Sequence, residues 1–351
     1  MNYLSPKANT IVPYTPGEQP RDRNYIKLNT NENAYPPSPR IEAALQGMAA
    51  QLRLYPDPEC TALRTAIARR HGLAPENVFV GNGSDEVLAF AFEALVGPEG
   101  VLSVDIGYTF YPVYAALFDL PYTTVPVRDD LSVPWRELIA GHTVALANPN
   151  APTSLGLDRD ALSQLAAGLR AQGKALILDE AYCDFGGESM ADAVGEFDNL
   201  LIVRTLSKSH ALAGLRVGYA LGAPGLIDGL NRIKNSFNSY TVAALAQAAA
   251  TAAVDDAGYF EHTRDMIVAT RARFTAQLRD MGFDVPDSRA NFVFPMHPRV
   301  PARTLFEGLR ARGILVRYFD KPRISNRLRI TIGTDAEMDA VVQALRELIG
   351  D

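Results

Sequence analysis

Residues 199–222 read NLLIVRTLSKSHALAGLRVGYALG, and this segment decides the fold prediction. An apolar run predicts a buried strand that ends at a polar loop with Thr205, Ser207 and Lys208, and a second apolar run follows Arg216. A lysine at the end of a buried strand is badly placed for a purely structural role, because lysine is rarely buried without a partner. The hydroxyls and the guanidinium offer donors for an anion beside an amine. A surface Ser-Lys loop would have the same composition.

Similar short apolar runs recur along the chain. They are NVFVG, VLSVD, TTVPV, TVALAN, ALILDEAY and RVGYALG, in addition to NLLIVRTLS, and amphipathic stretches such as 158–172 separate them. This alternation is typical of an α/β protein in which helices cover a mostly parallel sheet. We therefore predict the α/β class, with a seven-stranded, mostly parallel sheet in a large domain.

The composition changes at both ends of this region. The first thirty-odd residues are rich in proline, asparagine and polar groups without a helical period, which is typical of an extended arm. The run AALAQAAATAA near residue 250 lacks the glycine and serine of a flexible linker, so we expect a packed helix there. We predict an N-terminal arm that includes part of a small domain at 1–35, a large cofactor-binding domain at 36–250 and a small α+β domain at 251–351.

Charge and cysteine content exclude several classes of protein. The formal net charge of -6 argues against a general nucleic-acid binder, although it permits a local basic pocket. The two cysteines, Cys60 and Cys183, and the five histidines form no metal-binding pattern, so we expect buried or half-buried thiols in a reducing compartment. No stretch has the roughly 20 apolar residues that cross a bilayer, and the first residues lack a secretory signal. We expect a cytoplasmic protein with no membrane partner.

A second motif, ALILDEAYCDF, places Asp179 at the carboxyl end of an apolar strand. Sheets of α/β proteins bind their ligands at this end of the strands. A carboxylate there can keep a pyridine nitrogen protonated, and Tyr182 can donate to a phenolic oxygen on the same ring. An aspartate that caps the following turn would give the same sequence.

Two further loops follow predicted strands. In the glycine-rich turn at 81–85 the backbone can approach a phosphate at a helix N-terminus, although Ser84 could be a simple N-cap. The proline-rich loop 148–153 presents amides, including Asn150, at the same sheet edge. Between them Tyr108 could stack on an aromatic ring, or equally pack in the core.

Taken together, these motifs resemble the fold type I pyridoxal-phosphate aminotransferases over nearly the whole chain. Within that group the sequence is most similar to the histidinol-phosphate aminotransferase family. The segments that carry the resemblance are LNTNENAYPPSP, YPDPE, GNGSDE, the Pro-Asn-Ala-Pro-Thr loop, LDEAY, TLSKSHALAGLRVGY and LRITIGT. The resemblance implies pyridoxal 5'-phosphate as cofactor, with an amine for its aldehyde and donors for its phosphate.

The resemblance also implies a role for each matching residue. Lys208 is implied as the Schiff-base lysine and proton shuttle, Asp179 as the partner of the pyridine nitrogen, Tyr182 as the partner of the ring oxygen and Tyr108 as the stacking face. The residues implied around the cofactor phosphate are Ser84, Asp85, Thr205, Ser207 and Arg216.

The substrate site and the dimer are implied in the same way. Tyr55 matches a tyrosine that reaches the phosphate of the neighbouring subunit's cofactor, which implies a homodimer with shared active sites. Arg329 matches the arginine that holds the anionic end of the substrate. We expect Arg317 and Arg323 as helpers, and Tyr14 and Asn33 in the lining of the pocket.

Two departures from the family pattern are visible. Most relatives have an asparagine that contacts the ring oxygen where this chain has Ala151, and a glycine where it has Ser154. We expect Asn150, one position earlier than Ala151, to replace the missing asparagine. The proline usual before the stacking tyrosine is also absent, because Ile106 and Gly107 precede Tyr108.

The implied reaction is a ping-pong transfer of an amino group between histidinol phosphate and 2-oxoglutarate, with glutamate as the other product, in histidine biosynthesis. Two alternatives use the same lysine. A threonine-phosphate decarboxylase would break the bond to the carboxylate, and an aromatic aminotransferase would differ in its substrate pocket. A non-catalytic pyridoxal-phosphate sensor would need an added DNA-binding region, which we do not find.

Overall fold

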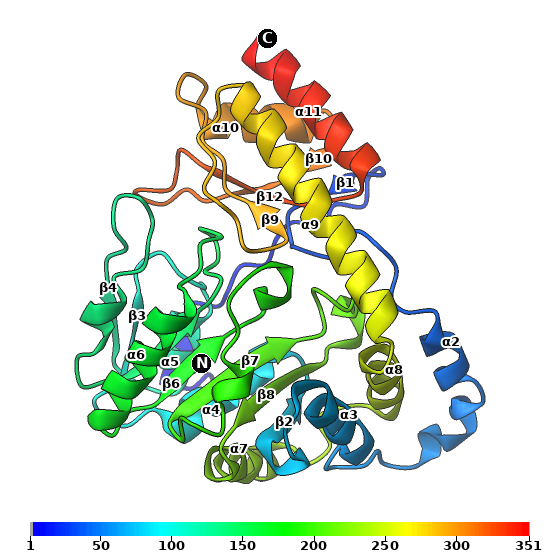
Figure 1. The fold of residues 1–351 in the computed structure, drawn as a ribbon, viewed down its shortest axis with the longest axis vertical. Helices are drawn as coiled ribbons and strands as arrows, with labels where there is room; N and C mark the ends of the chain where they lie inside the picture. The colour runs from blue at the N-terminus through cyan, green and yellow to red at the C-terminus, as the bar shows by residue number, and fades with distance from the viewer. Residues whose placement is uncertain (1–2, 351) are drawn as a thin grey trace.

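The computed structural model describes residues 3–350 and shows two lobes (Figure 1). The large lobe contains a seven-stranded sheet in the order β2-β8-β7-β6-β5-β3-β4. These strands are β2 (Val78–Gly81), β3 (Val101–Val104), β4 (Tyr122–Val125), β5 (Thr143–Ala147), β6 (Leu176–Asp179), β7 (Leu200–Thr205) and β8 (Gly218–Gly222). All neighbouring strands are parallel except β8, which is antiparallel to both β2 and β7. The predicted mostly parallel sheet of seven strands is therefore confirmed.

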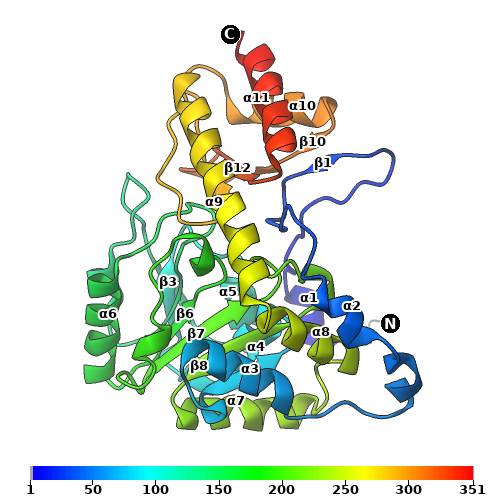
Figure 2. The same cartoon turned by 45° about the vertical axis from the view of Figure 1, so that its right-hand side comes forward.

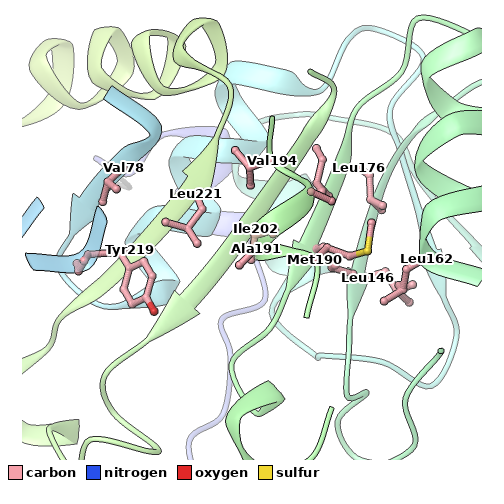
Figure 3. Close-up of a cluster of buried hydrophobic side chains, with 14 of the residues drawn as sticks. Val78, Leu146, Leu162, Leu176, Met190, Ala191, Val194, Ile202, Tyr219 and Leu221 are labelled. Atoms are coloured by element: carbon pink, nitrogen blue, oxygen red, sulfur yellow. The ribbon is translucent and has the colours of Figure 1, made fainter. Parts of the chain in front are cut away.

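Helices cover both faces of this sheet, which explains why all its strands except the edge strand β4 are buried along their whole length. Alternate residues of each strand point to opposite faces. On β7, Ile202 packs in the cluster that includes helices α3 (Thr61–His71), α6 (Arg159–Ala171) and α8 (Ala244–Val254). On the other face Leu201 and Val203 pack in the cluster of α4 (Ser84–Leu95), α5 (Tyr111–Leu117) and α7 (Pro224–Phe237). Figure 3 shows side chains of the first cluster, among them Leu146, Leu162 and Leu176.

The small lobe follows the long helix α9 (Ala257–Asp280), which runs from α8 to the top of the molecule (Figure 2). It contains the antiparallel sheet β11-β12-β9, made of β9 (Phe292–Val293), β11 (Arg317–Tyr318) and β12 (Leu328–Thr331). Helices α10 (Ala302–Ala311) and α11 (Asp335–Ile349) pack on it in a separate hydrophobic cluster. Thr334 and Glu337 form a capping box at the start of α11.

The N-terminal segment contacts both lobes. It contains a short helix, α1 (Pro6–Thr10), which the sequence did not predict; its N-cap Ser5 accepts from the backbone N–H of Ala8. Lys7 pairs with Asp119 of the large lobe at 2.6 Å. Further on, β1 (Ile26–Lys27) pairs in parallel with β10 (Ile314–Leu315) of the small lobe. The domain boundaries at 35 and 250 stay predictions.

The segment between the arm and the sheet forms helices α2 (Arg40–Leu45), η1 (Met48–Arg53) and α3, and α8 packs against α2 and α3. The alanine-rich run is therefore a packed helix, as predicted. Both cysteines are free and buried, and burial raises the pKa of the Cys60 thiol to about 12. Within residues 3–350 no helix is long and apolar enough to span a bilayer.

Candidate active site

A cavity of about 310 Å³ lies where the carboxyl ends of β5, β6 and β7 meet the N-terminus of α4 and the small lobe. Of the sixteen site residues predicted from the sequence, twelve line it. They are Tyr14, Ser84, Asp85, Tyr108, Asp179, Tyr182, Thr205, Ser207, Lys208, Arg216, Arg317 and Arg329. The parallel register, which sets Asp179 opposite Val203, explains why strand ends far apart in the sequence share this edge.

Lys208 lies in the loop after β7 and is half-buried. Its Nζ donates to the carbonyl of Thr30 at 3.1 Å and lies 5.9 Å from the centre of the Tyr182 ring. Burial and the nearby charge of Arg329 lower the pKa of Lys208 to about 8. This lysine therefore supplies an unprotonated amine near neutral pH more readily than an exposed one does.

Asp179 ends β6 at the floor of the cavity and is 5% exposed. Its carboxylate accepts from the backbone N–H of Ala181 at 3.1 Å and from the hydroxyl of Tyr111 at 3.2 Å. Burial raises the pKa of Asp179 to about 7. Among the described residues no cationic side chain pairs with it, so a cation within the cavity would complete its environment.

Glycines allow the loop after β7 to approach α4. At Gly83, where φ is +85°, a Cβ would lie 2.6 Å from Nη2 of Arg216, and at Gly218 a Cβ would lie 2.3 Å from the backbone N of Ser84. Arg216 also pairs with Asp85 in the first turn of α4 at 3.0 Å. A helix N-terminus and a guanidinium therefore face the same end of the cavity, which suits an anion.

The hydroxyls of the lysine loop lie at the same end. Thr205 Oγ1 accepts from the backbone N–H of Ser207 at 3.1 Å. The Oγ of Ser207 is buried, and it has no hydrogen-bond partner within the described chain. Because an unsatisfied buried hydroxyl is costly, this atom is suited to bind an anion that enters the cavity.

Two tyrosines lie on either side of the cavity. The hydroxyl of Tyr108 donates to Asp85 at 2.9 Å, so its ring is fixed beside the α4 N-terminus. The hydroxyl of Tyr182 accepts from Asn31 Nδ2 at 2.9 Å, and burial raises its pKa. Both side chains are half-buried and line the cavity together with Lys208 and Asp179, so they offer aromatic and hydroxyl contacts to a planar ring.

A cationic end of the cavity is formed by the small lobe. Arg329 on β12 donates through Nη2 to the carbonyl of Asn29 at 2.9 Å, whereas its buried Nε has no partner among the described residues. Burial and the charge of Arg317 lower the pKa of Arg329. Arg317 contacts the carbonyls of residues 15 and 16, and Tyr14 stacks on Phe110 with ring centres 4.4 Å apart.

Four predicted residues lie outside the cavity lining. The Nδ2 of Asn33 donates to the carbonyls of Lys208 and Ser209, so Asn33 holds the lysine loop instead of lining the substrate pocket. Arg323 binds Asp105 at 2.9 Å and lines only a neighbouring cavity. Tyr55 is 81% exposed and stacks on Tyr240, so it does not reach the cavity of its own chain.

The prediction for Asn150 is also corrected. This side chain is fully buried, and its Nδ2 donates to the carbonyl of Ile106 at 2.8 Å and to Thr153 at 3.0 Å. Its amide donors are thus used within the loop, and Ala151 lines the cavity in its place.

The cavity also contains residues that were not predicted from the sequence. Tyr111 donates to Asp179, but it lies in an aromatic-rich stretch of sequence in which nothing distinguishes it from core residues. The segment 29–32 contributes Asn29, Thr30, Asn31 and Glu32 to the lining. The motif LNTNENAYPPSP contains these residues, but we predicted only Asn33 from it as a site residue. The many asparagines of the motif were the available signal for further site residues.

An α/β lobe with a strand-end carboxylate and a buried lysine around one cavity defines the class of fold type I transferases. The chain matches the family model described as aminotransferase class I and II over residues 23–345. It is 49% identical over 352 residues to the histidinol-phosphate aminotransferase of Clostridium beijerinckii, covering 99% of this chain and 98% of that protein. It is 51% identical over 352 residues to histidinol-phosphate aminotransferase 1 of Bordetella parapertussis, with the same coverage. The chain belongs to the class I and II aminotransferases, within the group of histidinol-phosphate aminotransferases.

Solved structures agree with this placement. The histidinol-phosphate aminotransferase of Sinorhizobium meliloti in complex with pyridoxal-5'-phosphate is 27% identical, with a TM-score of 0.87 over 100% of this chain and 98% of that one. An aspartate aminotransferase variant from Thermus thermophilus has a TM-score of 0.83 at 19% identity, over 99% of this chain and all of that one, and so shares the fold.

Proposed function

We propose that this protein is a pyridoxal-phosphate-dependent enzyme that transfers the amino group between histidinol phosphate and 2-oxoglutarate. The observation that carries the proposal is the full-length identity of about half to curated histidinol-phosphate aminotransferases. The cavity supports it, because Arg329 offers a buried cation with a free donor to an anionic substrate. Both thiols are free, which fits the reducing cytoplasm where we place the enzyme.

The cavity fits pyridoxal phosphate in three respects. Asp179 is a buried carboxylate without a cationic partner in the described chain, as a protonated pyridine nitrogen requires. Ser207 has a buried hydroxyl without a partner, and Gly83 leaves the space beside Arg216 that a phosphate needs. When bound, the cofactor supplies an electron sink for the carbanion formed at the substrate's α-carbon.

The side chains divide the remaining work. The Nζ of Lys208 would hold the cofactor and, as a free amine, would accept the proton from the substrate's α-carbon and later return it. Its pKa of about 8 suits a base near neutral pH. Asp179 would keep the pyridine nitrogen protonated, and Tyr182, oriented by Asn31, would donate to the ring oxygen. Tyr108 would provide the stacking face.

Arg329 is the residue proposed to hold the anionic end of both substrates. One half-reaction brings a phosphate and the other a carboxylate, and the planar guanidinium can bind either through two N–H groups. Arg317 and Tyr14 lie at the same end of the cavity. Arg317 adds positive charge, and Tyr14 provides an aromatic wall.

We also propose that the enzyme is a homodimer with shared active sites. Five of the nine exposed large hydrophobic side chains in residues 3–350 belong to two segments that meet through the stacking of Tyr55 on Tyr240. These five are Leu52, Leu54, Tyr55, Phe237 and Tyr240. A patch of this kind is typical of a protein interface. The Arg216 and Asp85 side chains are 45% and 38% exposed, so the phosphate end of the cavity is open where a partner's tyrosine would reach it.

The substrate assignment is tested by comparing amino donors. Histidinol phosphate should be a far better donor than histidinol, because without the phosphate Arg329 stays unpaired. Equal rates would contradict the assignment and favour an aromatic or general aminotransferase. Release of CO₂ from threonine phosphate would instead identify a decarboxylase. The dimer is tested by analytical ultracentrifugation, and Tyr55→Phe should weaken cofactor binding without changing the mass of the assembly.

A further inference from the structure

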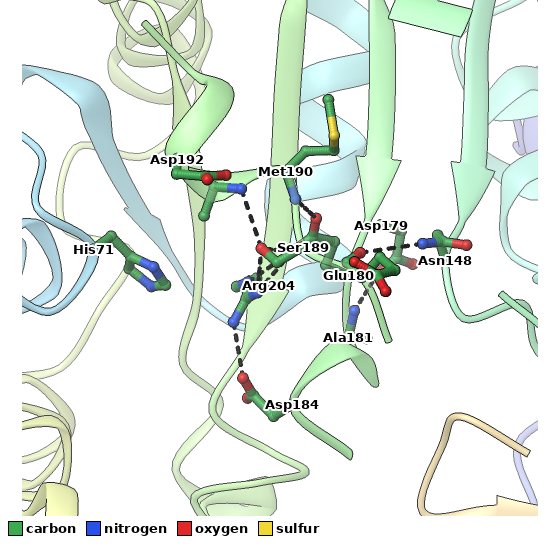
Figure 4. A network of polar contacts seen from close by, with 12 residues as sticks. His71, Asn148, Asp179, Glu180, Ala181, Asp184, Ser189, Met190, Asp192 and Arg204 are labelled. Carbon is green, nitrogen blue, oxygen red and sulfur yellow. Dashed lines mark hydrogen bonds and ion pairs between the residues drawn. The ribbon is translucent and has the colours of Figure 1, made fainter. Parts of the chain in front are cut away.

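A network of charged side chains lies at the ends of β6 and β7, and Figure 4 shows Arg204, Glu180 and Asp184 of this network beside Asp179. At its centre is Arg204, the residue before the end of β7, which is only 6% exposed. Its Nε and Nη2 donate to one carboxylate oxygen of Glu180 at 3.0 and 2.7 Å, and its Nη1 donates to Asp184 at 2.9 Å. Arg204 therefore connects the segment after β6 with its own strand.

The network continues from Asp184 to the residue after the lysine. The hydroxyl of Ser209 donates to Asp184 Oδ2 at 2.6 Å, and Nδ1 of His210 lies 3.2 Å from the same hydroxyl. Burial alone would raise the pKa of Asp184, but the charge of Arg204, together with His210 and Ser209, lowers it to about 2. Asp184 is therefore ionised and accepts a short, charge-assisted hydrogen bond from Ser209.

The loop that carries Lys208 is also bonded to the N-terminal segment. Asn33 donates to the carbonyls of Lys208 and Ser209 at 2.9 and 3.2 Å. The backbone around Lys208 is thus bonded to the N-terminal segment, and the side chain of Ser209 is bonded to Asp184. The bond from Ser209 to Asp184 is the one that continues through Arg204 to Glu180, the neighbour of Asp179.

A buried charge network is an expensive way to stabilise a fold. Well-packed apolar residues of similar volume are often at least as stabilising as a buried ion pair, because the charges lose their hydration. Catalytic groups, by contrast, need to be held within about 0.5 Å of their working positions. A network with directional bonds meets that need, because the rigid Arg204 guanidinium donates to both carboxylates.

We propose that Ser209 and Asp184, oriented by Arg204, are positioning residues that fix the Lys208 amine relative to Asp179. The inference rests on the proposed function, since it assumes that Lys208 holds the cofactor. It goes beyond that function by assigning a role to charged residues outside the lining of the cofactor cavity, none of which touches the substrate.

Two matched serine variants test this proposal. Ser209→Ala removes the hydroxyl that donates to Asp184. Ser189→Ala removes a hydroxyl of the same network that donates to Glu180 and accepts from Arg204 Nη2, both at 2.9 Å, away from the lysine loop. In the loaded enzyme, Ser209→Ala should lower kcat roughly tenfold with KM little changed, as expected for one charge-assisted hydrogen bond. Ser189→Ala should change kcat by less than about twofold at a comparable loss of thermal stability.

A second measurement does not depend on turnover. In the cofactor-free protein, well below its melting temperature, the rate at which an amine-reactive reagent labels Lys208 should rise severalfold in Ser209→Ala and stay at the wild-type value in Ser189→Ala. Equal labelling and equal kcat in the two variants would overturn the proposal and leave the network a structural one. The labelling result does not depend on which substrate the enzyme uses. A wrong substrate assignment can therefore be distinguished from a wrong assignment of the positioning residues.

Discussion

Replacing Asp179 with asparagine should stabilise the protein when it holds no cofactor. The carboxylate is buried and has two neutral donors, Tyr111 and Ala181, but no cationic partner in the described chain. Burial raises its pKa from 3.8 to about 7, so the ionised form is disfavoured in the folded state by about 4 kcal/mol. Asparagine has the same shape without the charge, and it removes this cost.

The stabilisation should depend on pH in a definite direction. Below about pH 4 the aspartate is protonated in both the folded and the unfolded state, so the variant gains nothing. Between pH 4 and pH 7 the unfolded chain releases a proton that the folded chain retains, and the stability of the wild type falls as the pH rises. The variant should exceed the wild type by about 4 kcal/mol at pH 8 and by less than half of that at pH 5.

Thermal unfolding of the two cofactor-free proteins at pH 5 and pH 8 measures this difference. For a chain of this length, about 4 kcal/mol corresponds to roughly 5 °C in the unfolding midpoint. Pyridoxal phosphate should reverse the order, because its pyridine nitrogen pairs with the carboxylate and stabilises only the wild type in this way. A difference that does not change with pH, or a variant less stable at pH 8, would refute the burial argument.

Activity provides a separate check on Asp179. The variant should retain some cofactor binding and lose most of its rate, because an amide cannot keep the pyridine nitrogen protonated. Near-normal turnover would mean that another residue performs this task.

Three further substitutions test other parts of the site. Lys208→Ala should abolish turnover and leave the fold intact, and borohydride reduction of the wild type should attach the cofactor to Lys208; a peptide map with the label on another lysine would contradict this. Gly83→Ala should weaken pyridoxal-phosphate binding at least tenfold in a fluorescence titration, since its Cβ would lie 2.6 Å from Arg216 at a φ of +85°. Arg329→Lys should lower kcat/KM by roughly tenfold to a hundredfold for both substrates; a loss for only one of them would show that the two anions have different anchors.

The architecture of the large lobe and the chemistry at its edge could be predicted from the amino-acid sequence alone. Apolar runs are continuous where both faces of a strand are buried, so seven strands were visible without any knowledge of their partners. Parallel strands end at one edge, and polar residues at or shortly after their ends, such as Asp179 and Lys208, therefore meet in one cavity.

The distant segments that complete this cavity could not be predicted without the folded chain. Thr30 and Asn31 contact Lys208 and Tyr182 across more than 150 residues of sequence, and no local period predicts such a pairing. Asn33 and Asn150 show that the orientation of a single side chain is equally hard to predict from the sequence. An asparagine near a site can face the cavity or bond a backbone carbonyl, and only the folded chain determines which it does. The network around Arg204 could not be predicted for the same reason. The sequence identifies Arg204 as a charged residue in an apolar strand, but it does not identify the carboxylates that bind this arginine in the folded chain.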